Sequence, residues 1–278
     1  MLQVRSKSTS PASPEEGNST APVPAIADPV QPPNSSGLPT VSQSLFISET
    51  FSSRQGEGKL TGQESFFIRT SGCNLRCWFC DTPYASWQPT GQRQSIESLV
   101  QDAQAVFADK PASHRHVVLT GGEPLLGAAI EPLCHLFHQA GFHVTLETAG
   151  TIQRELPCDL LSLSPKLASS APDAKQHPRW HQLHEQRRMP LNTMRYLIET
   201  AKDHQLKFVV SDRSQFDEIQ SLVEQLEVHP SNVFIMPQGV SIDDLDAALP
   251  WLQPWTEQVG YHYCDRMQIR WYGNRRGT

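Results

Sequence analysis

Three cysteines lie within eight residues of one another, and they are the part of the sequence that most directly implies chemistry. Cys73, Cys77 and Cys80 have the spacing CxxxCxxC. In a chain of 278 residues, thiolates at this spacing indicate a metal centre in a reducing compartment rather than a disulfide framework. Three thiolates on a four-iron cube leave one iron without a protein ligand, and such an open position suits catalysis.

A structural zinc site is the alternative for these cysteines. Zinc sites of that kind close with four protein ligands. The other cysteines, which are Cys134, Cys158 and Cys264, have no neighbouring Cys or His at zinc-knuckle spacing. We expect these three to be core residues and favour the iron–sulfur cluster.

A second chemical feature is the turn Thr120-Gly121-Gly122-Glu123-Pro124, which directly follows the predicted strand 116–119. Two consecutive glycines allow the backbone to approach a ligand closely. The alternative is a tight connection from strand to helix, with Pro124 in the first helical turn. The cysteine motif earlier in the chain favours the ligand-binding interpretation.

The elements that must position these motifs follow a βα pattern, in which short apolar runs alternate with longer amphipathic stretches. The predicted strands are 66–69, 116–119, 143–147, 160–163, 207–210 and 233–236, and the predicted helices are 95–109, 128–140, 190–204, 214–227 and 242–252. Plausible N-caps are Ser95, Ser214 and Ser241, and Gly141 is a helix stop. The pattern predicts an α/β fold with a barrel-like parallel sheet, whose functional loops follow the strands.

Composition and charge exclude several classes of protein. The net charge is −6 and the sequence pI is about 6.0, and no basic stripe is present, so nucleic acid is not the expected partner. No apolar run approaches the roughly 20 residues that span a bilayer, and the N-terminus lacks the apolar core of a secretory signal. We expect a soluble, cytoplasmic protein that does not enter a membrane.

Residues 1–44 differ from the rest of the chain because they are rich in Ser, Thr and Pro and contain no aromatic residue. Such a stretch buries too little apolar area to offset the entropy of ordering, so we predict a disordered tail. A transit peptide is the alternative, which Glu15, Glu16 and Asp28 disfavour. Residues 45–278 are predicted to form one core domain.

With both motifs in view, residues 45–278 resemble the radical S-adenosylmethionine (SAM) superfamily, whose members share a CxxxCxxC loop, a GGEP turn and a partial (β/α)6 TIM-like barrel. The resemblance implies reductive cleavage of SAM on a [4Fe–4S] cluster and abstraction of a substrate hydrogen atom. It also implies that Gly122 and Glu123 hold the methionine amino group of SAM.

Six further stretches resemble the 7-carboxy-7-deazaguanine synthase family. They are Gln55-Gly56-Glu57-Gly58, Phe67-Ile68-Arg69, Cys77-Trp78-Phe79-Cys80-Asp81-Thr82, Glu147-Thr148-Ala149-Gly150, Ser164-Pro165-Lys166 and Met236-Pro237-Gln238-Gly239. The resemblance implies a carbon–nitrogen lyase that converts 6-carboxy-5,6,7,8-tetrahydropterin to 7-carboxy-7-deazaguanine with loss of ammonia, in the biosynthesis of queuosine and other 7-deazapurines.

The same resemblance assigns residues to ligands. The pterin would be contacted by Arg54, Gln55, Gly56, Arg69 and Thr120. The SAM site would be lined by Phe79, Cys80, Asp81, Gly122, Ser164, Pro165, Lys166, Met236, Pro237, Gln238 and Gly239. Thr82 would ligate a Mg²⁺ ion that also binds the substrate carboxylate, which is chemically reasonable because Mg²⁺ prefers oxygen ligands. The alternative for Thr82 is a cap of the turn before Pro83.

Two of these positions also have a physical interpretation. Arg69 can bind a carboxylate through two parallel hydrogen bonds, although an ordinary ion pair at a strand end is the alternative. Glu57 can accept hydrogen bonds from the guanidine-like edge of a pterin, or it can be a solvated loop carboxylate.

The segment from Arg266 to Gly277 resembles the longer form of the family's ending, so the C-terminal substrate contact is left open.

The family resemblance further implies a homodimer and a flavodoxin-type electron donor, both by analogy. A radical-generating activase of a glycyl-radical protein is the alternative function, because it shares CxxxCxxC. That alternative does not call for the combination of the Gln55–Gly58 loop, Arg69 and Thr82.

Overall fold

The computed structural model describes residues 43–278, and it contains a nine-stranded sheet of order β3-β1-β2-β4-β5-β6-β7-β8-β9. The strands are β1 (Ser44–Arg54), β2 (Glu64–Thr70), β3 (Gln92–Ser95), β4 (His116–Gly121), β5 (His143–Thr148), β6 (Leu160–Leu163), β7 (His204–Val210), β8 (Val233–Pro237) and β9 (His262–Tyr263). From β2 to β9 neighbouring strands are parallel, whereas β1 pairs antiparallel with both β2 and β3. All six predicted strands are therefore present.

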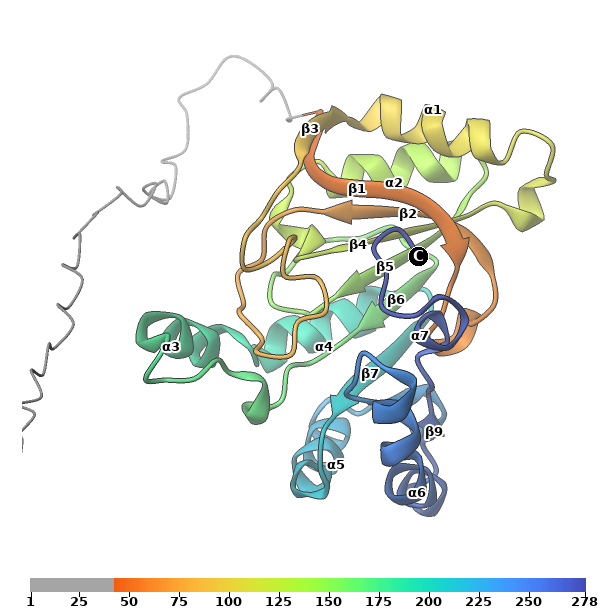
Figure 1. The fold of residues 1–278 in the computed structure, drawn as a ribbon. Coiled ribbons are helices and arrows are strands. Elements are labelled where there is room, and N and C mark those ends of the chain that lie inside the picture. Colours follow the sequence, from red (N-terminus) through yellow and green to blue (C-terminus); the bar gives the residue numbers. More distant parts are fainter. Residues whose placement is uncertain (1–42) are drawn as a thin grey trace, which may run out of the picture. The chain divides into compact units, whose positions relative to one another are not determined.

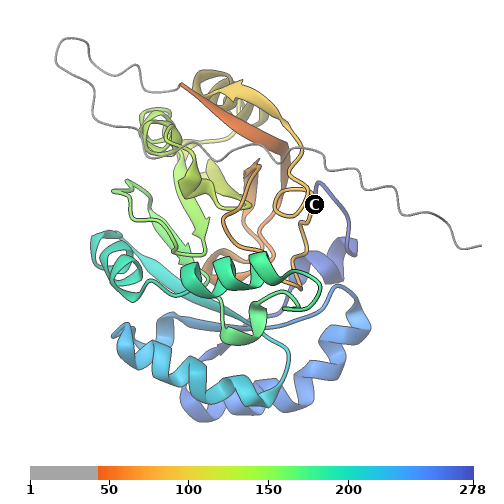
Figure 2. The same ribbon diagram turned by 90° about the vertical axis from the view of Figure 1, so that its left-hand side faces the viewer.

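Seven α-helices accompany the sheet in the described residues; most lie on the outer side of the curved sheet (Figures 1 and 2), whereas the last one follows β9 and contributes to the cavity wall. They are α1 (Ile96–Val106), α2 (Ile130–Gln139), α3 (Pro178–Arg187), α4 (Leu191–Thr200), α5 (Phe216–Gln225), α6 (Ile242–Val259) and α7 (Met267–Tyr272). The central strands are buried on both faces, as β4 and β6 show, and this explains why their sequences are continuous apolar runs. The fold is the predicted α/β class and agrees with a partial (β/α)6 barrel.

Local signals located most helix starts. Ser95 and Ser241 cap α1 and α6, because their side chains accept hydrogen bonds from backbone N–H groups three residues later. The predicted cap Ser214 is wrong: Asp212 caps a short 3₁₀ turn, and α5 begins at Phe216. The predicted helix 190–204 is too long, since His204 already belongs to β7.

Several elements had no clear signal in the sequence. Strand β1 is long and mostly half-buried. Its many polar residues therefore obscure the alternation of apolar and polar residues that would predict a strand. Helix α3 buries only His184 and therefore has no apolar stripe. Helix α6 runs on to Val259 although it contains Pro250 and Pro254.

The predicted tail lies almost wholly outside the described residues, and Ser44 is the first residue of β1. Within residues 43–278, no helix is both long enough and apolar enough to cross a membrane.

Candidate active site

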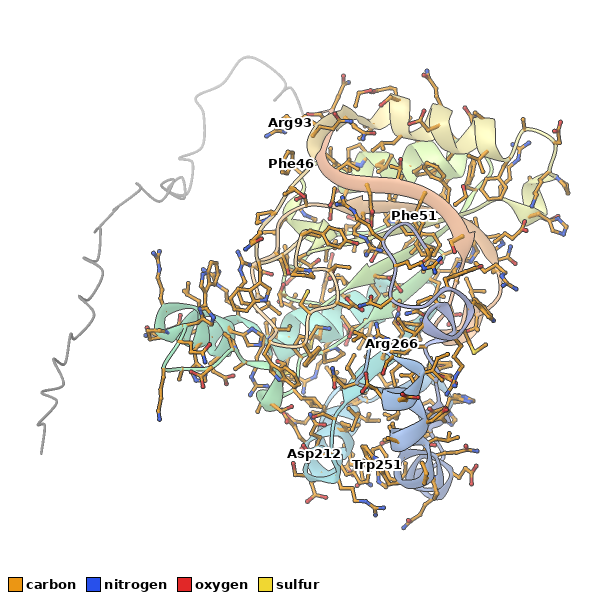
Figure 3. The ribbon with its side chains drawn as sticks, in the orientation of Figure 1. Phe46, Phe51, Arg93, Asp212, Trp251 and Arg266 are labelled. Atoms are coloured by element: carbon orange, nitrogen blue, oxygen red, sulfur yellow. The ribbon has the colours of Figure 1, made fainter. Side chains whose placement is uncertain are left out.

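A cavity of about 620 Å³ lies at the carboxyl ends of the parallel strands, a size suited to small-molecule ligands. Its wall contains most of the predicted site residues: Arg54, Gln55, Gly56, Glu57, Arg69, Cys73, Cys77, Phe79, Cys80, Asp81, Thr82, Thr120, Gly122, Ser164, Lys166, Met236 and Gln238. Phe51 of β1 and Arg266, which are labelled in Figure 3, also line it. The fold thus gathers motifs that are spread over the chain into one cavity.

The predicted residues that do not line this cavity are Glu123, Pro165, Pro237 and Gly239. Glu123 is fully buried, and its carboxylate accepts hydrogen bonds from the Thr148 hydroxyl at 2.7 Å and the Ala149 N–H at 2.9 Å. Burial raises its pKa despite these hydrogen bonds. In this structure Glu123 therefore fixes the GGEP turn to the end of β5.

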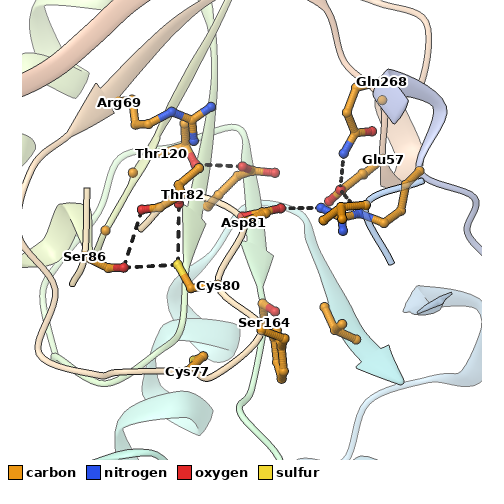
Figure 4. Close-up of a pocket in the computed structure, with 18 of the residues that line it drawn as sticks. Glu57, Arg69, Cys77, Cys80, Asp81, Thr82, Ser86, Thr120, Ser164 and Gln268 are labelled. Carbon is orange, nitrogen blue, oxygen red and sulfur yellow. Dashed lines mark hydrogen bonds and ion pairs between the residues drawn. The ribbon is translucent and has the colours of Figure 1, made fainter. Parts of the chain in front are cut away.

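The three cysteines of the CxxxCxxC motif lie on the loop after β2 and face the cavity. Burial raises the pKa of Cys73 to about 12 and that of Cys77 to about 11, so both need a positive centre to become thiolates at neutral pH. Cys80 Sγ lies 3.1 Å from Ser86 Oγ and 3.7 Å from Thr82 Oγ1. Figure 4 shows this group on one side of the cavity and Glu57 with Gln268 on the other.

Helix α3 and the segment before it hold the cysteine loop. The Arg76 N–H donates to Nδ1 of the buried His184 at 3.2 Å, so Nε2 carries the ring proton and donates to Ser170 Oγ at 2.8 Å. Burial lowers the pKa of His184 to about 4, which keeps Nδ1 free to accept. The Arg76 guanidinium stacks on Trp180 at 3.9 Å and donates to the Cys73 carbonyl at 2.7 Å.

The GGEP turn packs directly against the same loop. Glu123 N–H donates to the Gly72 carbonyl at 2.9 Å. A Cβ on Gly122 would overlap the carbonyl oxygens of Gly72 and Ala85. Glycine is therefore required at position 122 by close packing against the chain's own backbone, whereas the sequence suggested close approach to a ligand.

Opposite the cysteines lies a buried charged network around Glu57. Lys207 Nζ donates to Glu57 at 3.1 Å and to Glu147 at 2.7 Å, and its side chain is only 5% exposed. Arg266 Nε and Gln268 Nε2 also donate to Glu57, at 3.3 and 2.6 Å. Burial would raise the pKa of Glu57, but the charges of Lys207 and Arg266 outweigh it and lower the pKa to about 2.

This network excludes one of the two interpretations of Glu57, the solvated loop carboxylate. A carboxylate held by three side chains and 18% exposed is not a solvated loop residue. It stays ionised and acts as a fixed hydrogen-bond acceptor on the cavity wall.

Four members of this network were not predicted as site residues: Glu147, Lys207, Arg266 and Gln268. Glu147 was noted only as part of a motif, yet it accepts from Thr120 Oγ1 at 2.8 Å as well as from Lys207. Arg266 binds Asp81 and the Gly239 carbonyl besides Glu57. A lysine within an apolar strand was the one available signal for Lys207, because such a residue is rarely buried without a partner.

Arg69 and Thr82 lie on the side of the cavity nearer the cysteines. Arg69 Nε donates to Glu49 at 2.7 Å, and both side chains are largely buried. Thr82 Oγ1 contacts Cys80 Sγ across the turn. The expected ion pair of Arg69 is thus present through its Nε, although both partners are largely buried, and Arg69 also lines the cavity.

Comparison with known proteins now identifies the family. The sequence profile of the radical SAM superfamily matches residues 67–214. The chain is 59% identical to the 7-carboxy-7-deazaguanine synthase of Rhodopirellula baltica over 235 residues, which cover 84% of this chain and 89% of the relative. The chain belongs to the 7-carboxy-7-deazaguanine synthase family of radical SAM proteins.

Two further matches agree with this assignment. A synthase of the same name from Halobacterium salinarum is 42% identical over 236 residues, covering 81% of this chain and 89% of that relative. The crystal structure of QueE from Escherichia coli matches with a TM-score of 0.56 and 22% identity, covering 81% of this chain and 94% of that one. The second match concerns the fold alone.

Membership in the superfamily implies a [4Fe–4S] cluster and SAM, and the residues present fit both. Within the described part of the chain, no three His, Cys, Asp or Glu side chains are grouped to hold a single metal ion. Cys73, Cys77 and Cys80 all line the cavity, and their three thiolates would hold the cluster there. Gly122, Ser164 and Lys166 lie on the same wall, where SAM is expected.

Proposed function

We propose that this protein is a 7-carboxy-7-deazaguanine synthase, a carbon–nitrogen lyase that converts 6-carboxy-5,6,7,8-tetrahydropterin to 7-carboxy-7-deazaguanine with loss of ammonia. The observation that carries the proposal is the single cavity, which joins the three cysteines on one side to the ionised Glu57 network on the other. When bound, the cluster and SAM supply a 5′-deoxyadenosyl radical that abstracts a substrate hydrogen atom.

The chain's own residues orient the substrate. Glu57 accepts hydrogen bonds from the guanidine-like edge of the pterin, and Lys207 and Arg266 keep it ionised and fixed for this task. Arg69 donates to the substrate carboxylate from the far side of the cavity. Because these contacts lie on opposite sides of the cavity, they hold the flat substrate in a single orientation. Such orientation contributes strongly to the rate of the reaction.

Thr82 would hold Mg²⁺. Its hydroxyl lies on the cavity wall beside Cys80, and the described residues offer no cluster of carboxylates for an ion there. An ion with one protein ligand takes its other ligands from substrate and water, which Mg²⁺ commonly does. We therefore propose that Thr82 and the pterin carboxylate share the ion.

The remaining expectations rest on family analogy. They are a homodimer, a flavodoxin-type reductant, a cytoplasmic location and a place in queuosine or 7-deazapurine biosynthesis. The disordered tail of residues 1–44 also stays a prediction.

Anaerobic turnover tests the function directly. The reconstituted protein, supplied with SAM, Mg²⁺, reductant and the pterin, should form 7-carboxy-7-deazaguanine and ammonia without any protein substrate. Cleavage of SAM without pterin turnover, together with radical formation on an added glycyl-radical protein, would favour the activase instead.

The Thr82→Ala variant tests the metal assignment. It should keep cluster content and SAM binding while losing pterin turnover on the order of a hundredfold, because misplacement by about 1 Å has that effect. Wild type should respond to a Mg²⁺ titration and the variant only weakly. Equal Mg²⁺ dependence in both proteins would remove Thr82 from the metal site.

A further inference from the structure

Glu49 on β1 joins three other segments at the edge of the cavity. Its Oε1 accepts from Arg69 Nε of β2 at 2.7 Å and from the Tyr84 hydroxyl at 2.8 Å. Its Oε2 accepts from Arg276 Nε at 2.7 Å. One carboxylate therefore connects the substrate-facing arginine to the loop after the cysteines and to the segment that follows α7.

The segment after α7 forms part of the cavity wall through Gly273, Asn274, Arg275, Arg276 and Thr278. Arg276 fixes this segment by three kinds of contact. Besides the Glu49 ion pair, its Nη2 donates to the Ser48 carbonyl at 3.0 Å, and its guanidinium lies 4.2 Å from the centre of the Tyr84 ring.

The charges in this group explain why a second arginine matters. Glu49 and Arg69 alone form a buried pair with no net charge, which attracts an anionic ligand weakly. With Arg276 added, two cations share one carboxylate and one positive charge remains beside the cavity. Burial would raise the pKa of Glu49, but the hydrogen bonds from Arg276, Arg69 and Tyr84 outweigh it and lower the pKa.

The burial of the three partners differs. The side chains of Glu49 and Arg69 are 12% and 15% exposed, whereas Arg276 is 51% exposed. Arg69 and Glu49 thus form a buried ion pair that is held in place. Arg276 is the most exposed of the three residues, so its replacement should disturb the packing of the core least.

We propose that Arg276 is a positioning residue that, by engaging Glu49, makes Arg69 available to the carboxylate of the substrate. The proposal rests on the function proposed above, since it assumes that Arg69 meets that carboxylate. It adds a role for the C-terminal segment, which acts on the ligand through Glu49 rather than by touching it at Arg276.

The Arg276→Gln variant tests the proposal. We expect the KM and the calorimetric Kd for the carboxypterin to rise about tenfold, which corresponds to weakening one charge-assisted contact. The kcat, cluster content and melting temperature should change little. A tetrahydropterin that lacks the 6-carboxylate should bind wild type and variant with equal affinity, which a merely structural role would not produce.

Three matched variants make the test specific. Arg93→Gln removes the same charge from an exposed arginine of β3 that does not line the cavity, and it should raise Kd less than threefold, because no contact joins its guanidinium to Glu49 among the described residues. Arg276→Lys, which keeps the charge, should recover most of the affinity. In an Arg69→Gln background, Arg276→Gln should add almost nothing.

An unchanged Kd in Arg276→Gln, an equal loss in Arg93→Gln, or an equal loss for the ligand without the carboxylate would each overturn the proposal. These results are separate from the test of function. If wild type bound the carboxypterin but did not convert it, the synthase assignment would fail, while the calorimetric comparison would still decide the role of Arg276.

Discussion

Replacement of Lys207 by Met should destabilise the protein strongly. Lys207 contacts Glu57 at 3.1 Å and Glu147 at 2.7 Å, and Met would leave both carboxylates without this cation. Breaking a buried ion pair from one side costs about 3–5 kcal/mol. Glu147 is 31% exposed and Glu57 keeps Arg266, so the lower limit of about 3 kcal/mol applies.

For a protein of this size, about 3 kcal/mol corresponds to a fall in melting temperature of roughly 6–12 °C. Anaerobic differential scanning calorimetry of the reconstituted protein measures it. Lys59→Met is the matched control, because Lys59 binds Asp203 at 2.7 Å in an exposed pair worth no more than about 1 kcal/mol. Glu147→Gln added to Lys207→Met should recover part of the loss, since it removes one of the unpaired charges.

A fall in Lys207→Met no larger than that in Lys59→Met would refute the reasoning. So would a double variant that is less stable than Lys207→Met alone. Either result would show that the network is solvated rather than buried.

Three further predictions concern the cysteines, the GGEP turn and pH. Cys77→Ala should lose most iron and sulfide after anaerobic reconstitution, whereas Cys134→Ala should keep them. Gly122→Ala should lower both cluster content and SAM binding, measured by iron analysis and calorimetry, because its Cβ meets backbone oxygens. Burial beside His143 lowers the pKa of His116 to about 4, so the unfolded chain binds more protons between about pH 6.5 and 4. Stability should therefore fall on acidification through that range, and the fall should be smaller in His116→Phe; identical pH dependence of melting in the two proteins would contradict this.

The sequence alone determined six of the parallel strands and the two central motifs, and it missed the short parallel strand β9. Each central strand is a short apolar run because it is buried on both faces, so its signal is local. The CxxxCxxC spacing is also local, since three ligands of one cluster lie on one loop. Ser95 and Ser241 were readable for the same reason, because a cap acts within its own first turn.

Helix α3 shows where local reasoning fails. Its residues form no apolar stripe, because it contacts the cysteine loop through His184 and Trp180 rather than through aliphatic packing. Contacts through single polar or aromatic side chains produce no periodic pattern of apolar residues in the sequence. Only the tertiary structure shows that α3 supports Arg76 and, through it, the cysteines.

The charged half of the site was decided by the tertiary structure. Glu57 lies 150 residues from Lys207 and 209 from Arg266, and no pattern in the sequence pairs them. The sequence therefore determined which loop carries the cysteines and six of the nine strands of the sheet. The order of the strands and the packing of the C-terminal segment against the cavity decide which charged residues form ion pairs. Desolvation in the cavity increases the energetic consequence of each of these ion pairs.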